Sequence, residues 1–200
     1  MMPENKHGAC RGFSMIEVLV SLFVLLVGLL GAAGVMLQSQ RAEFESYQRV
    51  QAMILLQDMV SRINANRYVA PCYAITDGIT GLPFLGTAST VTLACITATA
   101  PAATTDRIDT AVEDMTQWSS LLTGSAETSG GNNVGAMIGA RGCISRDPAT
   151  NVYTISIAWQ GLGNTLAPSA GLPCAKNQFD EAASRRVVST TLEFGNLSGL

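Results

Sequence analysis

An apolar run without charges near the N-terminus limits what this chain can fold into more than any other feature. Residues 18–37 contain no charged side chain, and Ser21 is the only polar one among them. A helix of about 20 apolar residues crosses the hydrocarbon core of a bilayer, which is roughly 30 Å thick. We therefore expect residues 13–37 to form the membrane-spanning half of a long helix.

A single carboxylate, Glu17, stands immediately before this run. Placing a carboxylate at membrane depth costs on the order of 2.5–3.5 kcal/mol, so an acid at that depth is expected to have a function and a partner. The alternative is that Glu17 lies at the level of the lipid headgroups and interacts with the positive end of the helix dipole. The residues alone leave both interpretations open.

The composition argues against several classes of function. The formal net charge is −3 and only 14% of the residues are charged, so the chain lacks the broad basic surface that non-specific nucleic-acid binding requires. Nucleic acid is therefore not an expected partner. The stretch between Asp77 and Asp106 contains no charged residue, which is typical of exported surface loops.

The five cysteines are Cys10, Cys72, Cys95, Cys143 and Cys174. If the segment that contains Cys10 is removed from the mature protein, four remain, enough for two disulfides in an oxidising compartment. Among the three possible connectivities we expect Cys72–Cys95 and Cys143–Cys174, because this pairing keeps both loops local.

The order of small and apolar residues differs from that of an ordinary secretory signal. Gly12 precedes the apolar run, and Lys6, His7 and Arg11 lie on its N-terminal side. Cleavage at Gly12 would leave the apolar helix attached to the product, whereas a secretory signal loses its apolar core. The cations also favour a cytoplasmic N-terminus.

The segment Gly12-Phe13-Ser14-Met15-Ile16-Glu17-Val18-Leu19-Val20 resembles the class III signal of type IV pilins and of type II secretion pseudopilins. The resemblance implies that residues 1–12 are a leader, which prepilin peptidase removes by cutting after Gly12. It also implies N-methylation of Phe13 and pairing of Glu17 with the terminal amine of a neighbouring subunit. Two buried opposite charges offset their desolvation only when they are closely paired.

An amphipathic continuation is expected from residue 38 to residue 68. Its apolar residues return at helical intervals: Val50, Met53, Ile54, Leu56, Val60 and Ile63. No proline interrupts residues 13–68, which predicts one helix of about 55 residues, roughly 80 Å long. Asn64, Asn66 and Pro71 are expected to end it.

Small residues recur inside the apolar half. Gly28, Gly31 and Gly34 are spaced by three, and Gly28 with Ala32 makes a small-xxx-small pair suited to close packing of helices. The alternative is that glycine is simply common in membrane helices.

The remaining residues, 69–200, predict a globular head made of an αβ-loop over 69–135 and an antiparallel sheet over 136–200. A helix is expected from Ala111 to Leu122, because Thr110 and Glu113 have capping-box spacing and Gly124 follows the last apolar position. Trp118 lies on the apolar stripe of this helix and is expected in the core.

Three strands are expected in the head. Asn151–Gln160 alternates apolar and small or polar residues, which predicts a strand buried on one face, and Ala136–Ser145 is its expected antiparallel partner across a turn. Arg186–Phe194 alternates again. The amphipathic half of the long helix is the expected cover for the sheet, which gives an α+β class.

The segments Ala158-Trp159-Gln160-Gly161, Cys174 and Arg185-Arg186-Val187-Val188 together resemble the PilV-type minor pilins, also called type IV pilus modification proteins. This resemblance implies the type IV pilin fold and roles in pilus biogenesis, twitching motility and surface attachment. The implied partners are major and minor pilins, prepilin peptidase and the inner-membrane assembly platform. The implied location is the bacterial inner membrane, with the head in the periplasm and later on the pilus. Arg185 and Arg186 are assigned no ligand, and a solvated strand end would also explain them.

Catalysis is not expected. Histidine is absent from residues 13–200, which excludes nucleophile schemes that need an imidazole, and no glycine loop for phosphate or zinc spacing occurs. The acids at the start of the predicted helix are explained by its dipole: Asp106, Asp109, Glu113 and Asp114. Asp180 and Glu181 are too few for a calcium site, so we expect no metal and no cofactor.

Two further functions remain open. The same signal and helix occur in pseudopilins of type II secretion systems. The other is an adhesin or a DNA-uptake minor pilin whose head binds a ligand.

Overall fold

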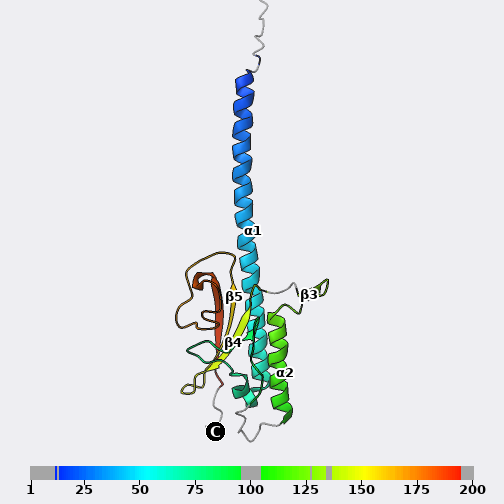
Figure 1. The fold of residues 1–200 in the computed structure, drawn as a ribbon, viewed down its shortest axis with the longest axis vertical. Helices are drawn as coiled ribbons and strands as arrows, with labels where there is room; N and C mark the ends of the chain where they lie inside the picture. The colour runs from blue at the N-terminus through cyan, green and yellow to red at the C-terminus, as the bar shows by residue number, and fades with distance from the viewer. Residues whose placement is uncertain (1–11, 13, 96–104, 127, 134–136, 195–200) are drawn as a thin grey trace, which may run out of the picture. The chain divides into compact units, whose positions relative to one another are not determined.

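The computed structural model describes residues 12, 14–95, 105–126, 128–133 and 137–194. Its first element is a continuous helix, α1 (Met15–Ala65), labelled in Figure 1. The chain divides into two compact units, Met1–Phe44 and Glu45–Leu200, so that α1 contributes to both.

The α-helix ends at Ala65, between Asn64 and Asn66, which were expected to end it, and three residues before the predicted bound at Tyr68. A 3-10 helix, η1 (Arg67–Tyr73), follows, and Val69 inside it has non-helical backbone angles. Pro71 lies within η1 and has no N–H to donate.

The head contains a four-stranded antiparallel sheet in the order β1-β4-β5-β6. Its strands are β1 (Leu85–Gly86), β4 (Arg141–Arg146), β5 (Tyr153–Gln160) and β6 (Arg185–Leu192). The three predicted strands are therefore present with shorter bounds, and residue 136 of the first lies outside the described residues. The expected α+β class is confirmed. A small hairpin of β2 (Thr128–Ser129) and β3 (Asn132–Asn133) was not predicted.

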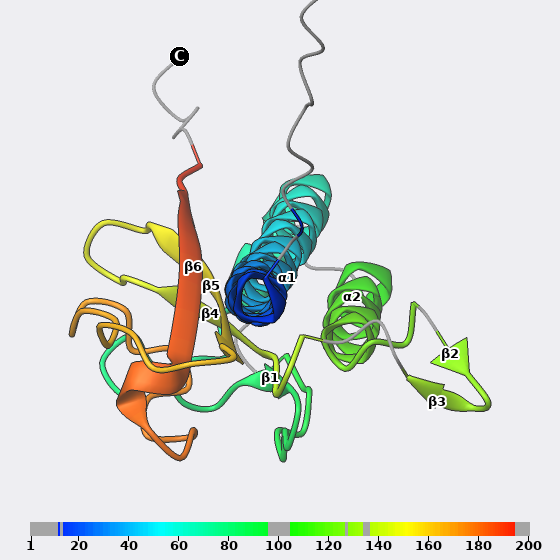
Figure 2. The same ribbon diagram turned by 90° about the horizontal axis from the view of Figure 1, so that it is seen from above.

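One face of the sheet packs against helices. The second half of α1 and the helix α2 (Thr105–Leu122) lie on this face, as the view in Figure 2 shows. The indole Nε1 of Trp118 donates to the backbone oxygen of Leu55 at 2.8 Å, which joins the two helices directly. The core formed here has members from both helices and from the sheet, among them Leu56, Met59, Ile63, Met115, Trp118, Ile144, Tyr153, Ile155, Ile157 and Trp159.

The buried face of α1 differs in part from the predicted one. Leu56 and Ile63 are buried as expected, and the remaining buried positions are Gln48, Ala52 and Met59. Val50, Met53 and Ile54 are exposed, together with Phe44 and Tyr47. Tyr47, Val50 and Ile54 are spaced as i, i+3 and i+7, which places them along one face of the helix. We call these three residues the exposed stripe of α1.

The opposite face of the sheet is also buried, so the prediction that β5 is buried on one face only was wrong. Cys143, Ala158, Cys174 and Ala175 form a second apolar cluster with Phe84. The chain between β5 and β6 supplies Cys174 and Ala175 to this cluster. Small side chains such as Ser156 and Ala158, which alternate with the large ones of β5, allow this close cover.

The helix α2 begins earlier than predicted, at Thr105 rather than near Thr110. The hydroxyl of Thr110 donates to the backbone oxygen of Asp106 one turn back, and Glu113 accepts from Gln117. The capping box was therefore a wrong prediction, because both residues lie inside the helix. Its end agrees with the prediction, since Gly124 follows with a positive φ of 83°.

Candidate processing and assembly segment

The first turn of α1 contains Glu17. The backbone oxygen of Ser14 accepts from the N–H groups of Glu17 at 3.0 Å and Val18 at 3.4 Å, and the Ser21 hydroxyl donates to the Glu17 backbone oxygen at 2.7 Å. The Glu17 side chain is exposed, close to the positive end of the helix dipole. Gly12 is exposed ahead of the helix, whereas Phe13 lies outside the described residues.

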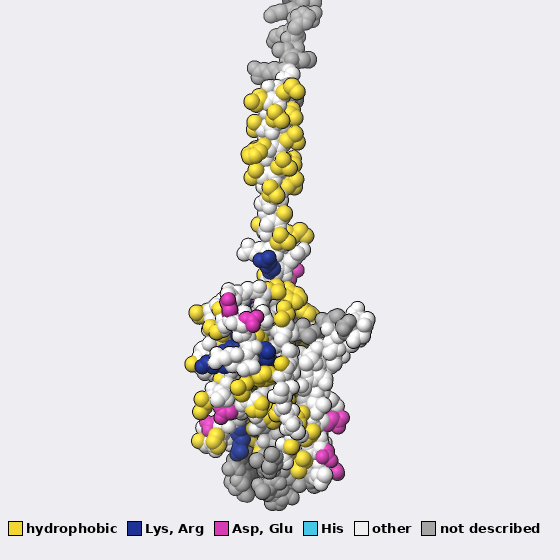
Figure 3. Space-filling model, in the orientation of Figure 1, with side chains coloured by type: hydrophobic (Ala, Val, Ile, Leu, Met, Phe, Trp, Pro, Cys, Tyr) yellow, Lys and Arg dark blue, Asp and Glu magenta, His cyan; other side chains and the backbone are white. Residues whose placement is uncertain are grey.

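The first unit exposes nearly all of its apolar side chains. Every residue of α1 from Met15 to Phe44 is exposed, and Figure 3 shows apolar side chains over this part of the helix. The described residues include one helix that is long and apolar enough to cross a membrane, judged by length and composition. An apolar surface of this extent requires lipid or other apolar helices around it.

The glycines of this unit are not explained by contacts within the described chain. A Cβ atom added at Gly28, Gly31 or Gly34 would meet nothing within 4 Å. Ala32 lies one turn after Gly28 and is exposed as well. These small residues leave room for the close approach of another apolar helix, which stays a prediction.

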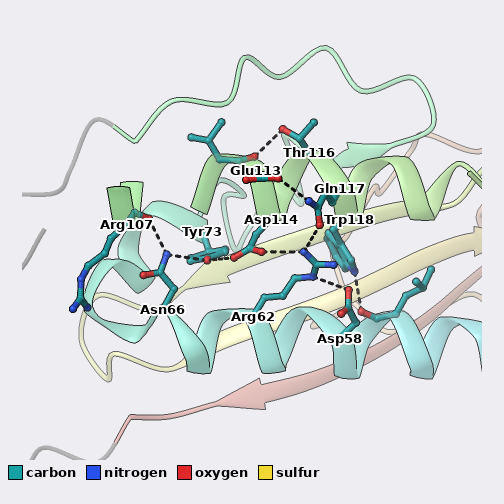
Figure 4. Close-up of polar contacts among 12 residues, drawn as sticks. Asp58, Arg62, Asn66, Tyr73, Arg107, Glu113, Asp114, Thr116, Gln117 and Trp118 are labelled. Carbon is teal, nitrogen blue, oxygen red and sulfur yellow. Dashed lines mark hydrogen bonds and ion pairs between the residues drawn. The ribbon is translucent and has the colours of Figure 1, made fainter. Parts of the chain in front are cut away.

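The end of α1 is held to the head by a cluster of polar side chains centred on Arg62 (Figure 4). The Arg62 guanidinium donates from Nε to Asp58 at 2.9 Å and from Nη1 to Asp114 and Gln117, each at 2.9 Å. Because Asp114 and Gln117 belong to α2, these bonds connect the two helices. Arg62 also lies in the last turn of α1, where a cation interacts favourably with the helix dipole.

Asp114 extends the cluster to η1. The hydroxyl of Tyr73 donates to the other oxygen of Asp114 at 2.5 Å, and the Asn66 amide donates to the backbone oxygen of Arg107 at 2.8 Å. Tyr73 is fully buried, and this burial together with its hydrogen bond to Asp114 raises the pKa of Tyr73 well above its ordinary value. The helix-dipole explanation of Asp114 was therefore wrong, because Asp114 joins three elements of the head.

The two arginines at the start of β6 also have partners in the structure. The interpretation of these residues as a solvated strand end was therefore wrong. Arg185 is buried and donates to the backbone oxygens of Leu172 and Cys174, each at 2.8 Å. Arg186 forms an ion pair with Glu45 at 3.3 Å and donates to the Gly163 backbone oxygen.

The structure joins the cysteines in the pairs that we expected. Cys72 and Cys95 have Cα atoms 4.9 Å apart, and Cys143 and Cys174 have Cα atoms 5.7 Å apart. The second disulfide joins the segment between β5 and β6, which carries Cys174, to Cys143 of β4. Cys10 lies outside the described residues.

Within the described ranges, no group of three or more His, Cys, Asp and Glu residues could hold a metal ion. Asp180 and Glu181 do not form such a group, and Glu181 accepts a hydrogen bond from Asn164. The expectation that the protein is not an enzyme stays a prediction.

Comparison with known families agrees with this geometry at the N-terminus. Residues 8–33 match a family model described as the prokaryotic N-terminal methylation motif. Neither the curated proteins nor the solved structures gave a match. The matched residues include Gly12, Glu17, Gly28 and Gly31, and they end in the exposed apolar part of α1. The chain therefore carries a prepilin-type N-terminal signal of the kind found in type IV pilin-like proteins.

Proposed function

We propose that this protein is a minor pilin, a non-catalytic structural subunit of a type IV pilus. The main support is the methylation motif over residues 8–33, which continues directly into an exposed apolar helix. A signal of this type leaves the helix on the mature protein, and the helix then needs apolar neighbours to bury its side chains. A filament of similar subunits supplies such neighbours.

In this proposal Glu17 pairs with the methylated amine of Phe13 in a neighbouring subunit. This pairing requires a carboxylate that a neighbouring subunit can reach. Glu17 fits this requirement, because it lies in the first turn of α1 and is exposed. A carboxylate in an apolar filament is strongly unfavourable without a cation beside it. The small residues at 28, 31, 32 and 34 then permit close helix packing.

The finer assignment is a PilV-type minor pilin that acts in pilus biogenesis, twitching motility and surface attachment. Its partners are major and minor pilins, prepilin peptidase and the inner-membrane assembly platform. The protein first resides in the bacterial inner membrane with its head in the periplasm, and then moves into the pilus. The resemblance of the β5 and β6 segments to PilV-type proteins supports this assignment.

Processing is tested by the intact mass and the N-terminal sequence of the protein isolated from its own cells. The expected product lacks residues 1–12 and begins with N-methylated Phe13. A product that retains these residues would contradict the proposal. The same measurement in cells without prepilin peptidase serves as the control and should give the uncut chain.

Assembly is tested with Glu17→Ala in cells that make the filament. The variant should be cleaved normally but be largely missing from filaments sheared off the cells, as measured by immunoblotting. Glu43→Ala is the matched control, because Glu43 is an exposed carboxylate of the same helix beyond the apolar run. Equal recovery of Glu17→Ala and the parent protein in filaments would refute the pairing.

The main alternative is a pseudopilin of a type II secretion system, which has the same kind of signal. Deleting the gene for this protein separates the two functions. Loss of surface pili with normal protein secretion favours the pilin, whereas a secretion defect with normal pili favours the pseudopilin.

A further inference from the structure

A pocket of about 490 Å³ lies at the end of the head where η1, β4 and β5 meet. Its volume is in the range of sites for small organic ligands, roughly 300–1,000 Å³. The lining combines two guanidinium groups with aromatic, amide and apolar side chains: Arg67, Tyr68, Ala70, Pro71, Arg146, Asn151, Tyr153 and Phe194.

Both arginines of the pocket are held by neighbouring side chains. The Nε of Arg146 donates to Asn151 at 2.7 Å, and the same guanidinium lies 6.0 Å from the centre of the Tyr153 ring. The guanidinium of Arg67 lies 5.6 Å from the centre of the Tyr68 ring. Contacts of this kind reduce the entropy that an arginine loses on binding a ligand. Among the described residues, no hydrogen bond or ion pair involves the terminal nitrogens of Arg146, which are donors.

The local backbone places Asn151 where it can hold Arg146. Asn151 has a positive φ of 59°, and its N–H donates to the backbone oxygen of Asp147 at 2.9 Å, which closes the turn between β4 and β5. Asn tolerates this conformation better than most residues. The turn thus places the side chain of Asn151 beside Arg146 in the lining of the pocket.

The charged residues that line this pocket are all positive. None of the lining residues is acidic, and the ion pairs found in the described part of the chain involve Arg62 and Arg186 only. Asp147 follows Arg146 and Glu193 precedes Phe194 in the sequence, but neither acid lines the pocket, and Asp147 accepts from the N–H of Ala149 at 2.8 Å. This bond and the one from Thr150 lower the pKa of Asp147, so Asp147 is ionised and takes part in its own turn.

We propose that this pocket binds a carboxylated sugar, with the carboxylate on Arg67 and Arg146. Guanidinium groups recognise carboxylates through paired hydrogen bonds, and aromatic and apolar side chains fit the flat carbon faces of a sugar ring. The amide of Asn151 and the hydroxyl of Tyr68 supply partners for sugar hydroxyls.

The composition of the pocket favours a sugar acid over nucleic acid. A strand of nucleic acid is held by a groove of cations that follows many phosphates, and its bases stack on accessible aromatic faces. The pocket is lined by two cations, Arg67 and Arg146, which is fewer than a groove that follows a strand requires. The formal net charge of −3 further disfavours a polyanion.

The test measures binding to the full-length protein in neutral detergent micelles by isothermal titration calorimetry. The probes are glucuronate, galacturonate and N-acetylneuraminate, with glucose, inorganic phosphate and a single-stranded oligonucleotide as comparisons. At least one sugar acid should bind, and more tightly than every comparison probe. Arg67→Gln and Arg146→Gln should each weaken that binding about tenfold or more, as expected for the loss of a hydrogen bond to a charged group.

Arg49→Gln is the matched control, since Arg49 is an exposed arginine of α1 that does not line the pocket. It should leave affinity unchanged, and unchanged near-ultraviolet circular dichroism should show that all variants are folded. The proposal is overturned if no sugar acid binds, if Arg49→Gln has an equal effect, or if a comparison probe binds more tightly. The assay needs no filament, so its outcome is independent of the proposed pilin role.

Discussion

Asp114 connects three elements of the head through one carboxylate. Its oxygens accept from Arg62 of α1 at 2.9 Å and from Tyr73 of η1 at 2.5 Å, while Asp114 itself belongs to α2. Its side chain is only 16% exposed, so water competes weakly for these bonds. Asp114 therefore fixes the position of the last turns of α1 relative to α2.

We expect Asp114→Asn to lower the free energy of unfolding of the head by about 1–3 kcal/mol, because hydrogen bonds to a charged group are replaced by weaker ones. The measurement is urea unfolding of the full chain in micelles, followed by the fluorescence of Trp118 and Trp159, which are both buried in the head. Asp109→Asn makes the same change of charge at an exposed position of α2. Equal stability of the two variants would contradict a stabilising role for Asp114.

For single residues, the sequence predicts features whose residues are close together in the chain. Gly12, Glu17 and the apolar run follow one another in one short segment. The prepilin-type signal can therefore be recognised without a structure. The bond between Arg62 and Asp114 spans 52 positions, and nothing in the spacing of either residue indicates the other. The same holds for Arg67 and Arg146, which line one pocket although 79 positions separate them in the sequence.

Between elements, Gly142 sets the distance from α2 to the sheet. A Cβ atom at this position of β4 would collide with the indole ring of Trp118 and would lie 2.7 Å from a methyl group of Leu122. Trp118 and Leu122 are both fully buried on α2. The absence of a side chain at Gly142 therefore allows the helix to pack directly on the strand.

We expect Gly142→Ala to destabilise the head by about 1–3 kcal/mol, the usual effect of overfilling a packed core. Thermal unfolding followed by near-ultraviolet circular dichroism provides the measurement, since Trp118 lies at the point of collision. Gly163→Ala is the control, because a Cβ atom there meets nothing within 4 Å. If Gly142→Ala left the midpoint of thermal unfolding unchanged, α2 would be able to move away from β4 without loss of stability, which would contradict the prediction.

At the element scale, periodicity predicted the helices and the main strands but not their limits. β5 and β6 alternate clearly, whereas β1 has only two residues and is too short to show any pattern. The start of α2 was misplaced because Thr110 and Glu113 imitate a cap within the helix. Burial of the outer face of β5 depends on the segment that carries Cys174, which has no periodic pattern of its own.

At the scale of the molecule, the two units need different surroundings. The unit Glu45–Leu200 buries its own core and contains both disulfides. The unit Met1–Phe44 exposes the apolar residues of α1 and depends on lipid or neighbouring helices. The α+β class was predictable because this contrast is visible in the sequence as an apolar run followed by mixed, alternating segments.

We expect Leu26→Lys to weaken the association with membranes, because a lysine at the centre of a spanning helix costs about 2.5–3.5 kcal/mol. Leu26 lies within the apolar run and is exposed in the structure. The measurement is the fraction of protein that alkaline carbonate releases from isolated membranes. Leu26→Ala, which removes bulk without adding charge, should stay in the membrane. Equal release of both variants would argue against a spanning segment centred here.

The exposed stripe of α1 has a practical consequence for a shortened chain. Tyr47, Val50 and Ile54 belong to the unit that begins at Glu45, and each is more than half exposed at 53%, 51% and 60%. A fragment starting at Glu45 would therefore keep an exposed apolar surface after the apolar half of α1 is removed. We expect this fragment to self-associate as its concentration rises. Hydrophilic replacements at those three positions, combined with the truncation, should yield a monodisperse fragment suited to crystallisation.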